Sequence, residues 1–433
     1  MLFDDLPLEV LQRIFTFCCG AVTLKEPSQT PGTRTGATQV TLSLVCSRWR
    51  EVVLNTSELW GDVAVDYHAI GEQELATTSL FQSAHNWLNR AGMTPISLSI
   101  YVFGASESQV AAISQILLSS FHVTRLDVRS FYSSLLAPTN NLSRLERLKL
   151  TLYRPRRTTH NFPRLSEMPS LKELYFRLDL GKFVDITNIY LIPWHQLRVF
   201  HLSQYYWPSR MLLNILQQCK SLVWCTLFVK LEDGQHEHDI ILPNLEHLLL
   251  DMNGVGNADP FIRSLTLPNL RSLEITSLEW SMKPLLNPKA IIIMAQRSGF
   301  NKYLTDFSLC LTEQPVDVRS LLASMPALKR VQLEGPFMFQ PGTFDDLSSG
   351  TIGPRLEEID FGVMSDEEIG LLLETVGQRH EKAKTVSDIR AFASVAGCFS
   401  GNKFGRDFES HKQRAKQCSE AFNVHVELHP RLF

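Results

Sequence analysis

One apolar pattern recurs along most of this chain and restricts the folds that it can adopt. A six-residue unit carries apolar residues at its first, fourth and sixth positions, as in LERLKL and LEHLLL. Each unit begins with leucine, and the units start at Leu145, Leu171, Leu197, Leu222, Leu245, Leu270, Leu304, Leu328 and Leu356. The fourth and sixth residues share one face of an extended strand, because successive side chains of a strand point to opposite faces. Each unit therefore predicts one short strand with one apolar face.

The spacing of the units predicts how these strands are arranged. Successive units start 23–28 residues apart, apart from one interval of 34, and leucine-rich repeats have periods of about 20–29 residues. A single unit cannot bury its apolar face, whereas stacked units bury a continuous core beneath a parallel sheet. Helical patterns at 209–219, 287–297 and 317–323 provide the connections. We expect an α/β solenoid, made irregular because most units lack the usual Asn or Cys; the alternative is an ordinary α/β domain.

A different pattern occupies the first sixty residues. Apolar residues recur at helical spacing in LPLEVLQRIFTF (6–17) and in SLVCSRWREVV (43–53), and TSELW (56–60) follows. Helices this short are marginally stable alone in water and need a surface on which to dock. We therefore expect a small helical module that binds a partner. Residues 20–39 are rich in Thr, Gly and Pro, a composition that predicts a flexible loop.

The three blocks L-P-x-E-x-L-x-x-I-F, L-V-C-x-x-W-R-x-V and L-W resemble the F-box, in the form common in large fungal families of F-box proteins. The resemblance implies binding to the Skp adaptor of SCF-type cullin–RING ubiquitin ligases. The implied adaptor-binding residues are Leu6, Pro7, Leu8, Leu11, Ile14, Phe15, Val45, Trp49, Leu59 and Trp60. Helical spacing does not separate those that face the adaptor from those that hold the module together. The best single candidates for contact are Leu6, Pro7, Leu8, Ile14 and Trp49.

These patterns divide the chain into four segments. Residues 1–62 form the F-box with its flexible insert at about 20–39, and residues 63–122 form a linker helix and the first strands. The leucine-rich-repeat-like solenoid follows at 123–363, and residues 364–433 form a C-terminal capping segment. Ser365 and Glu368 have the spacing of a helix capping box. The structure of 386–405 stays open, because its pattern fits neither helix nor strand.

The sequence contains no motif typical of catalysis, a cofactor or a metal. It has neither a Gly-rich phosphate loop nor a G-x-S-x-G elbow. The HEH stretch at 236–238 has no third ligand nearby, so a solvated loop is favoured over a metal site. His425 and His429 flank the last predicted strand, and we expect them to face solvent. Three cysteines on apolar faces are expected to be small core residues, namely Cys18, Cys46 and Cys225.

Composition favours an intracellular protein. The net charge of −3 gives no electrostatic reason for binding nucleic acid or an anionic membrane. Eight scattered cysteines without a C-x-x-C pair favour reduced thiols. Acidic residues near the N-terminus disfavour a secretion signal, and no apolar run reaches the about 18 residues of a membrane span. We expect a cytoplasmic or nuclear location.

The resemblance and the repeats together predict a substrate-recognition subunit of a ubiquitin ligase that is not itself an enzyme. Its partners would be the Skp adaptor, the cullin scaffold and an unidentified protein substrate. The alternative is a repeat scaffold that uses its F-box-like helices outside ubiquitination. Substrate-facing candidates are the residues between buried leucines on the strands, namely Lys149, Thr151, Tyr175, Arg177, His201, Glu274 and Gln332.

Two further stretches leave alternatives open. RPRR at 154–157 is either a solvated loop or a contact for an acidic or phosphorylated substrate. QYYWPSR at 204–210 either provides aromatic binding anchors or packs over the neighbouring repeat. The sequence does not identify the substrate, its phosphorylation or the oligomeric state of the chain.

Overall fold

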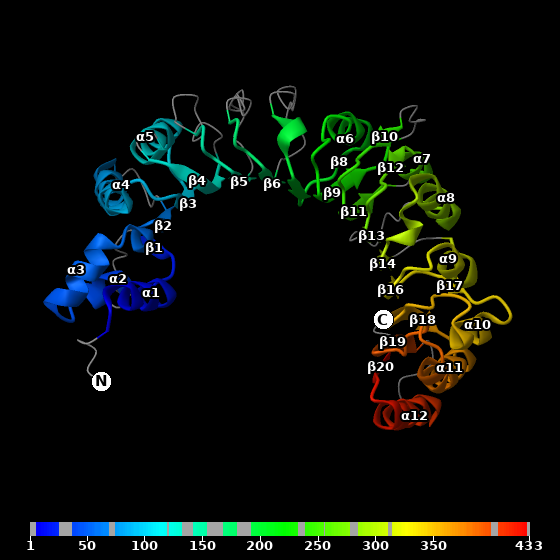
Figure 1. Ribbon diagram of the computed structural model, residues 1–433. Helices are drawn as coiled ribbons and strands as arrows, with labels where there is room; N and C mark the ends of the chain where they lie inside the picture. Colours follow the sequence, from blue (N-terminus) through cyan, green and yellow to red (C-terminus); the bar gives the residue numbers. More distant parts are fainter. Residues whose placement is uncertain are drawn as a thin grey trace. The chain divides into compact units, whose positions relative to one another are not determined.

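The computed structural model describes residues 6–25, 37–68, 74–118, 121–131, 142–153, 168–179, 192–232, 239–254, 256–277, 285–310, 314–399 and 406–430. The chain divides into two compact units, Met1–Tyr205 and Tyr206–Phe433. Both units consist of parallel strands joined by helices, and unit 1 begins with additional short helices (Figure 1). Among the described residues, no helix combines the length and apolar character needed to cross a membrane.

Short helices open unit 1, as the apolar spacing predicts. They are α1 (Leu8–Cys18), α2 (Thr38–Ser43), α3 (Ser47–Asn55) and the 3₁₀ helix η2 (Ser57–Trp60). Their side chains meet between the helices: the rings of buried Phe15 and half-buried Trp49 lie 5.0 Å apart. Trp60 is also buried, and its Nε1 donates to the carbonyl of Val53 at 2.9 Å. Helices that are marginal alone thus stabilise one another by burying a common core.

The segment predicted as a flexible insert is partly ordered secondary structure. Residues Val22–Lys25 form strand β1, which pairs in parallel with β2 (Asp62–His68). At the other end of the segment, the side chain of Gln39 is buried, and its Nε2 donates to the carbonyls of Leu59 (2.9 Å) and Gly20 (3.3 Å). Composition could not predict β1, because its order depends on pairing with a strand some forty residues away. Residues 26–36 lie outside the described residues.

The sheet of unit 1 follows chain order, and each strand is parallel to its neighbour. After β1 and β2 come β3 (Ile96–Phe103), β4 (Val123–Ser130), β5 (Arg147–Tyr153), β6 (Glu173–Asp179) and β7 (Val199–Ser203). Helices α4 (Glu74–Leu88) and α5 (Glu107–Leu118) cover one side of the sheet (Figure 1), with 3₁₀ turns η3 (Asn89–Ala91) and η7 (Trp194–Gln196) between elements. Leu148, Leu174 and Phe200 lie in register and are buried.

Unit 2 repeats this arrangement over a longer parallel sheet. Its strands are β9 (Trp224–Lys230), β11 (His247–Asn253), β13 (Ser272–Thr276), β14 (Asp306–Leu309), β16 (Arg330–Leu333), β18 (Glu358–Met364), β19 (Ser394–Phe399) and β20 (His425–Pro430). Strand β8 (Trp207–Pro208) pairs with β9, and two small pairs join β10 (Ile240–Ile241) to β12 (Leu265–Thr266) and β15 (Val316–Asp317) to β17 (Phe337–Met338).

Helices connect the strands of unit 2 along one side of its sheet (Figure 1). They are α6 (Ser209–Leu216), α7 (Asp259–Arg263), α8 (Pro288–Ser298), α9 (Val318–Ser324), α10 (Thr343–Ser349), α11 (Asp366–Thr385), α12 (Arg406–Phe422) and the 3₁₀ helix η8 (Phe300–Lys302). All three helical connections expected from the sequence are present. Ser365 and Glu368 form the predicted capping box at the start of α11.

The predicted α/β arrangement of parallel strands with connecting helices is confirmed, and each of the nine units contains a strand of a parallel sheet. The first leucine of every unit is fully buried, and it lies two residues before the start of its strand. The same strand–helix alternation extends beyond the nine units, through β2 to β4 at one end and through α11, β19, α12 and β20 at the other. The stretch that the sequence left open contains β19, whereas residues 400–405 lie outside the described residues.

Candidate protein-binding surfaces

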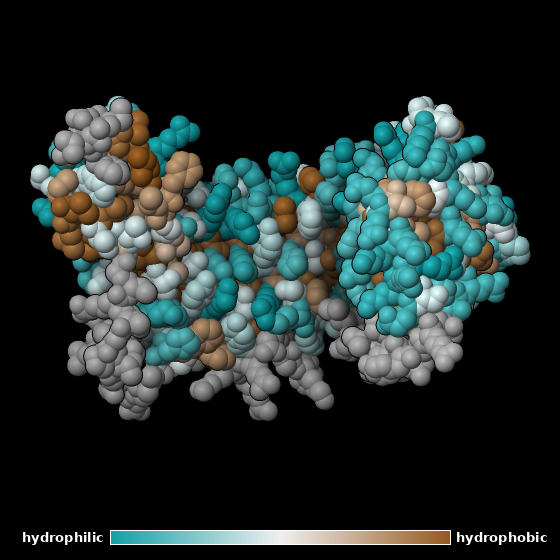
Figure 2. All heavy atoms as spheres, turned by 90° about the horizontal axis from the view of Figure 1, so that it is seen from below, coloured by the Kyte–Doolittle hydropathy of each residue, from teal (hydrophilic) through white to brown (hydrophobic). Residues whose placement is uncertain are grey.

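The N-terminal helices expose an unusual number of large apolar side chains. We call this set the N-terminal apolar surface; it comprises Leu8, Val10, Phe17, Val40, Leu44, Val45 and Leu54. Phe17 is the most open of them, with 84% of its surface exposed. Figure 2 shows apolar side chains gathered over this end of unit 1, on the left of the view. Exposed apolar patches of this kind mark sites of interaction with other proteins or ligands.

The structure separates the predicted adaptor-binding residues into interior and surface positions, which helical spacing could not do. The interior set is Leu11, Phe15, Leu59 and Trp60. The exposed set is Pro7, Leu8 and Val45, and the half-buried set is Leu6, Ile14 and Trp49. The buried residues hold the helices together, so only the other six have surface that a partner could touch.

Sequence reasoning left five members of the N-terminal apolar surface out of its set. They are Val10, Phe17, Val40, Leu44 and Leu54. A signal was available for three of them, since Val10 and Phe17 share a helical flank of α1 with Ile14, and Leu44 precedes Val45 in the apolar block at 43–53. Val40 and Leu54 carried no comparable signal, because their exposure depends on how the helices pack.

Polar contacts fix the start of α1 against α3. Nη2 of Arg48 donates to the carbonyl of Leu6 at 2.5 Å. Cys46 caps α3, because its sulfur accepts a hydrogen bond from the main-chain N–H of Trp49 at 3.4 Å. The first contact holds Leu6, just before α1, against α3, and the second fixes the start of α3 next to Trp49.

The three cysteines expected in the core differ in their environments. Cys225 is fully buried, and burial raises the pKa of its thiol well above the ordinary value. Cys46 is half-buried as the helix cap. The prediction for Cys18 is wrong, because the last residue of α1 is exposed. Its apolar spacing continues the α1 pattern, but the helix ends there and no element of the described part of the chain covers that face.

Predicted substrate residues of unit 1 come together on the exposed side of β5, β6 and β7. Lys149, Tyr175 and His201 lie at matching register positions on these neighbouring strands. The Tyr175 and His201 rings are 5.8 Å apart, and Nζ of Lys149 lies 3.5 Å from Oδ2 of Asp127. Burial, and then the nearby charge of Lys149, lower the pKa of the His201 imidazole. The three residues thus form one row across the sheet.

The next row along the sheet contains Arg177, which is exposed, and Thr151, which is not. Only 2% of Thr151 is exposed, so the prediction that it contacts a substrate is wrong. Its register neighbours are Arg129 and Arg177, whose longer side chains stand on either side of the short hydroxyl. Strand alternation predicts the face of a side chain but not how far it projects.

The remaining substrate candidates lie in unit 2, where carboxylates gather on the strands. Glu274 and Gln332 share a register row through Ser308, and Nε2 of Gln332 donates to Oε1 of Glu334 at 2.7 Å. Burial, and then the charge of Glu334, raise the pKa of the Glu274 carboxyl. The same two causes raise the pKa of Asp360. This face of unit 2 therefore carries excess negative charge.

Two aromatic residues of the 204–210 stretch, Tyr206 and Trp207, pack rather than project. Trp207 is fully buried, and the Tyr206 hydroxyl donates to Oδ1 of Asp251 at 3.1 Å. The basic stretch 154–157 and the HEH stretch 236–238 lie outside the described residues. His425 and His429 are exposed, as expected, and both contact the carboxylate of Glu427.

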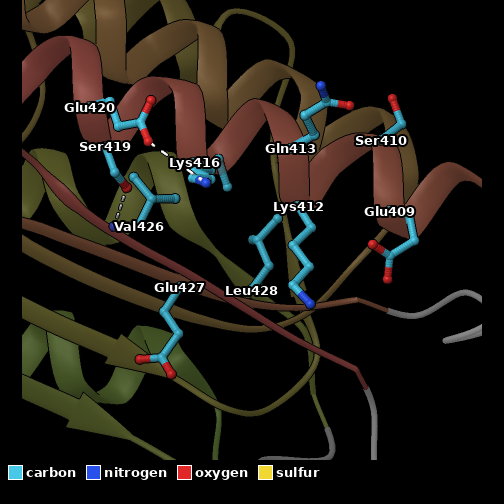
Figure 3. A pocket seen from close by; sticks show the side chains of 11 residues that line it. Glu409, Ser410, Lys412, Gln413, Lys416, Ser419, Glu420, Val426, Glu427 and Leu428 are labelled. Carbon is cyan, nitrogen blue, oxygen red and sulfur yellow. Dashed lines mark hydrogen bonds and ion pairs between the residues drawn. The ribbon is translucent and has the colours of Figure 1, made fainter.

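A groove between α12 and β20 is lined mainly by polar and charged side chains (Figure 3). Lys416 and Glu420 form a 3.9 Å ion pair along α12, and Ser419 Oγ accepts a hydrogen bond from the main-chain N–H of Val426. Within the described part of the chain, no group of three or more His, Cys, Asp or Glu residues is placed to bind a metal ion.

Comparisons with known proteins bear on the N-terminal segment. Residues 3–65 match the family described as F-box-like. No curated protein matches the chain. Among solved structures, a crystal structure of a Bacteroides fragilis protein aligns over 85% of this chain and 74% of its own, with 11% sequence identity and a TM-score of 0.26. The chain therefore carries an F-box-like domain at residues 3–65, followed by parallel strands with connecting helices.

Proposed function

We propose that this chain is the substrate-recognition subunit of an SCF-type cullin–RING ubiquitin ligase. The observation that carries the proposal is the F-box-like domain at residues 3–65, with its N-terminal apolar surface open to solvent. In this proposal the domain binds a Skp adaptor, which connects it to the cullin scaffold. The strands that follow hold a protein substrate, in the cytoplasm or the nucleus.

The proposed role involves binding and not catalysis. A receptor subunit holds its target beside the catalytic arm of the ligase, which raises the effective concentration of the target there. The exposed apolar side chains supply the binding free energy on the adaptor side, since full burial of one large apolar side chain is worth about 1.5–3 kcal/mol. A parallel sheet with polar side chains on its open face offers the area that a protein substrate needs.

Adaptor binding tests the proposal most directly. Pro7, Leu8 and Val45 are exposed, so a Leu8→Ala, Val45→Ala double variant should fold normally and bind a purified Skp adaptor about tenfold more weakly or worse. An Ile241→Ala, Ile293→Ala variant is the matched control, because both of its isoleucines are exposed apolar residues of unit 2. Isothermal titration calorimetry gives the affinities.

Failure of this experiment is informative. If the wild-type chain does not bind the adaptor, or if the double variant binds as tightly as the control, the proposal is contradicted. The scaffold alternative would then be favoured. Purification of the chain from cells, followed by mass spectrometry for adaptor and cullin, provides an independent check.

A further inference from the structure

The exposed side of β4, β5 and β6 carries more cations than its own carboxylates can neutralise. We call this set the basic strand face; its members are Arg125, Asp127, Arg129, Arg147, Lys149, Glu173, Tyr175 and Arg177. Five of these side chains are cationic and two are acidic, and Asp179 at the end of β6 is a third acidic residue at a register position of the same side. All members of the basic strand face are exposed or half-buried, so the excess positive charge faces solvent.

Ion pairs within the face account for only part of its charge. Asp127 lies 3.5 Å from both Arg129 and Lys149. Glu173 lies 3.5 Å from Arg147. Among the described residues, neither Arg125 nor Arg177 has a carboxylate within ion-pair distance, so these two guanidinium groups are available to an external anion.

Aromatic rings hold two of the other guanidinium groups in place. Arg129 stacks over Tyr101 at 4.5 Å, and Arg147 stacks over Tyr175 at 4.6 Å. A stacked guanidinium keeps its N–H edges free to donate, and it loses less conformational freedom on binding than a mobile lysine does. Burial, and secondly the positive charge of Lys149 in this face, lower the pKa of the His201 imidazole on the neighbouring strand.

We propose that the basic strand face binds an extended acidic segment of a protein, rich in Asp and Glu. The identification of that protein as the substrate rests on the proposed function; the binding itself does not. Neighbouring strands are about 4.8 Å apart, so β4 and β6 are separated by about 10 Å. Arg177 also lies four register positions further along the strands than Arg125, so the two residues are about 16 Å apart. An extended segment of about six residues spans that distance and can place carboxylates against Arg125 at one end and Arg177 at the other.

The two carboxylates within the face favour a peptide over a nucleic acid. A nucleic acid strand carries a phosphate at every nucleotide, and some of these would lie against Asp127 or Glu173. An acidic peptide can place uncharged residues at those points and still reach the cations around them. The overall charge of −3 also gives long strands of phosphate no general attraction to the chain.

Peptide binding to the purified full chain, without adaptor, tests the inference. Three fluorescent ten-residue peptides of alternating Gly with Glu, Gln or Lys serve as probes in fluorescence polarisation. The Glu peptide should bind, the other two should not, and added salt should weaken binding because the contacts are ionic. Equal binding of the Glu and Gln peptides would overturn the inference.

Substitution locates the site. An Arg125→Gln, Arg177→Gln variant should bind the Glu peptide about tenfold more weakly. The matched control, Arg210→Gln with Arg355→Gln, changes two exposed arginines of unit 2 and should bind within about twofold of wild type. Retained binding by the first variant would place the peptide elsewhere and overturn the assignment.

Two further measurements exclude other occupants. A single-stranded RNA that binds this face more tightly than the Glu peptide would replace the inference with nucleic-acid binding. A dimer in sedimentation that dissociates in the Arg125, Arg177 variant would instead make a second copy of the chain the occupant. The same variant should bind the adaptor normally, so failure here and failure of the proposed function are distinguishable.

Discussion

Arg379 of α11 is fully buried and donates its hydrogen bonds to main-chain carbonyls. Nε, Nη1 and Nη2 reach five of them at 2.6–3.3 Å, on Leu347, Gly353, Pro354, Leu356 and Arg390. Burial lowers the pKa of the guanidinium to about 10, so the group stays charged at neutral pH. One side chain thus joins the end of α10, the approach to β18 and the approach to β19.

Replacing this side chain should destabilise unit 2 strongly. Arg379→Met removes five hydrogen bonds to main-chain carbonyls, three of them buried, and should lower the free energy of unfolding by about 3–5 kcal/mol. Arg355→Met, at an exposed position, should cost less than about 0.5 kcal/mol. Urea unfolding followed by circular dichroism measures both. A loss in Arg379→Met no larger than in the control would show that water replaces the guanidinium.

Glu274 provides a prediction that depends on pH. Its raised pKa means that the folded chain holds the carboxyl proton more firmly than the unfolded chain does. The resulting stability is present below the unfolded pKa of about 4.3 and is lost as pH rises through the folded pKa. Glu274→Gln should therefore raise the free energy of unfolding at pH 7 by up to about 0.5 kcal/mol, and leave it unchanged near pH 3.5.

Urea unfolding at the two pH values measures this difference. Glu246→Gln is a suitable contrast, because Glu246 pairs with Arg271 at 3.5 Å and its loss should not stabilise the chain. A Glu274→Gln variant that is no more stable than wild type at pH 7 would mean that the repulsion from Glu334 is screened by solvent.

Among the elements, the repeated strands could be predicted from the sequence, whereas β1, α2 and β19 could not. The leucines at fixed spacing predict each repeated strand, because the same apolar pattern determines which of its side chains are buried. Residues 22–25 are too few to show a clear alternation of apolar and polar side chains. They form a strand because β2 lies beside them and pairs with them. Small residues dilute the pattern of β19, where Ala396 and Gly397 occupy the middle positions.

The same limit applies to the candidate sites. Which apolar residues belong to the F-box-like helices could be predicted from their motif, but not which of them are buried. Leu11 and Leu8 are both leucines of one short helix, and only packing against α3 and η2 makes one interior and the other exposed. The prediction that Thr151 is exposed is wrong for a related reason, because its exposure depends on the length of the side chains on either side of it.

Gln39 should matter more to stability than its place in a Thr/Gly/Pro-rich stretch implies. Gln39→Ala removes the donor of two carbonyls, at Gly20 and Leu59, next to β1 and η2. We expect a loss of about 1–3 kcal/mol in the free energy of unfolding and faster amide hydrogen exchange in β1. Gln217→Ala, at an exposed position after α6, is the control. Unchanged exchange in β1 would show that strand pairing alone orders the segment.

At the scale of the whole molecule, the net charge of −3 conceals two opposite surfaces. The basic strand face belongs to unit 1, and the carboxylates around Glu274 and Asp360 belong to unit 2. Composition averages the two and so gave no electrostatic reason to expect either. The register of the strands reveals both charged surfaces, because it shows which charged side chains lie next to one another on neighbouring strands.

The N-terminal apolar surface and the basic strand face share no residue, so their substitutions should act independently. Leu8→Ala with Val45→Ala should weaken adaptor binding and leave binding of the Glu peptide unchanged, and Arg125→Gln with Arg177→Gln should do the reverse. In the combined variant the two changes in binding free energy should add to within about 0.5 kcal/mol. A larger deviation would indicate that one surface influences the other.

Strand β1 also bears on how the N-terminal domain could be exchanged between proteins. The strand lies between α1 and α2 in the chain, yet it pairs with β2, beyond the end of η2. A fragment cut after Trp60 would lose β2 and expose the N–H and C=O groups of β1, which invites aggregation. The module that can be transferred intact therefore ends no earlier than His68. A fusion of this domain to another repeat protein must include β2 as well as β1.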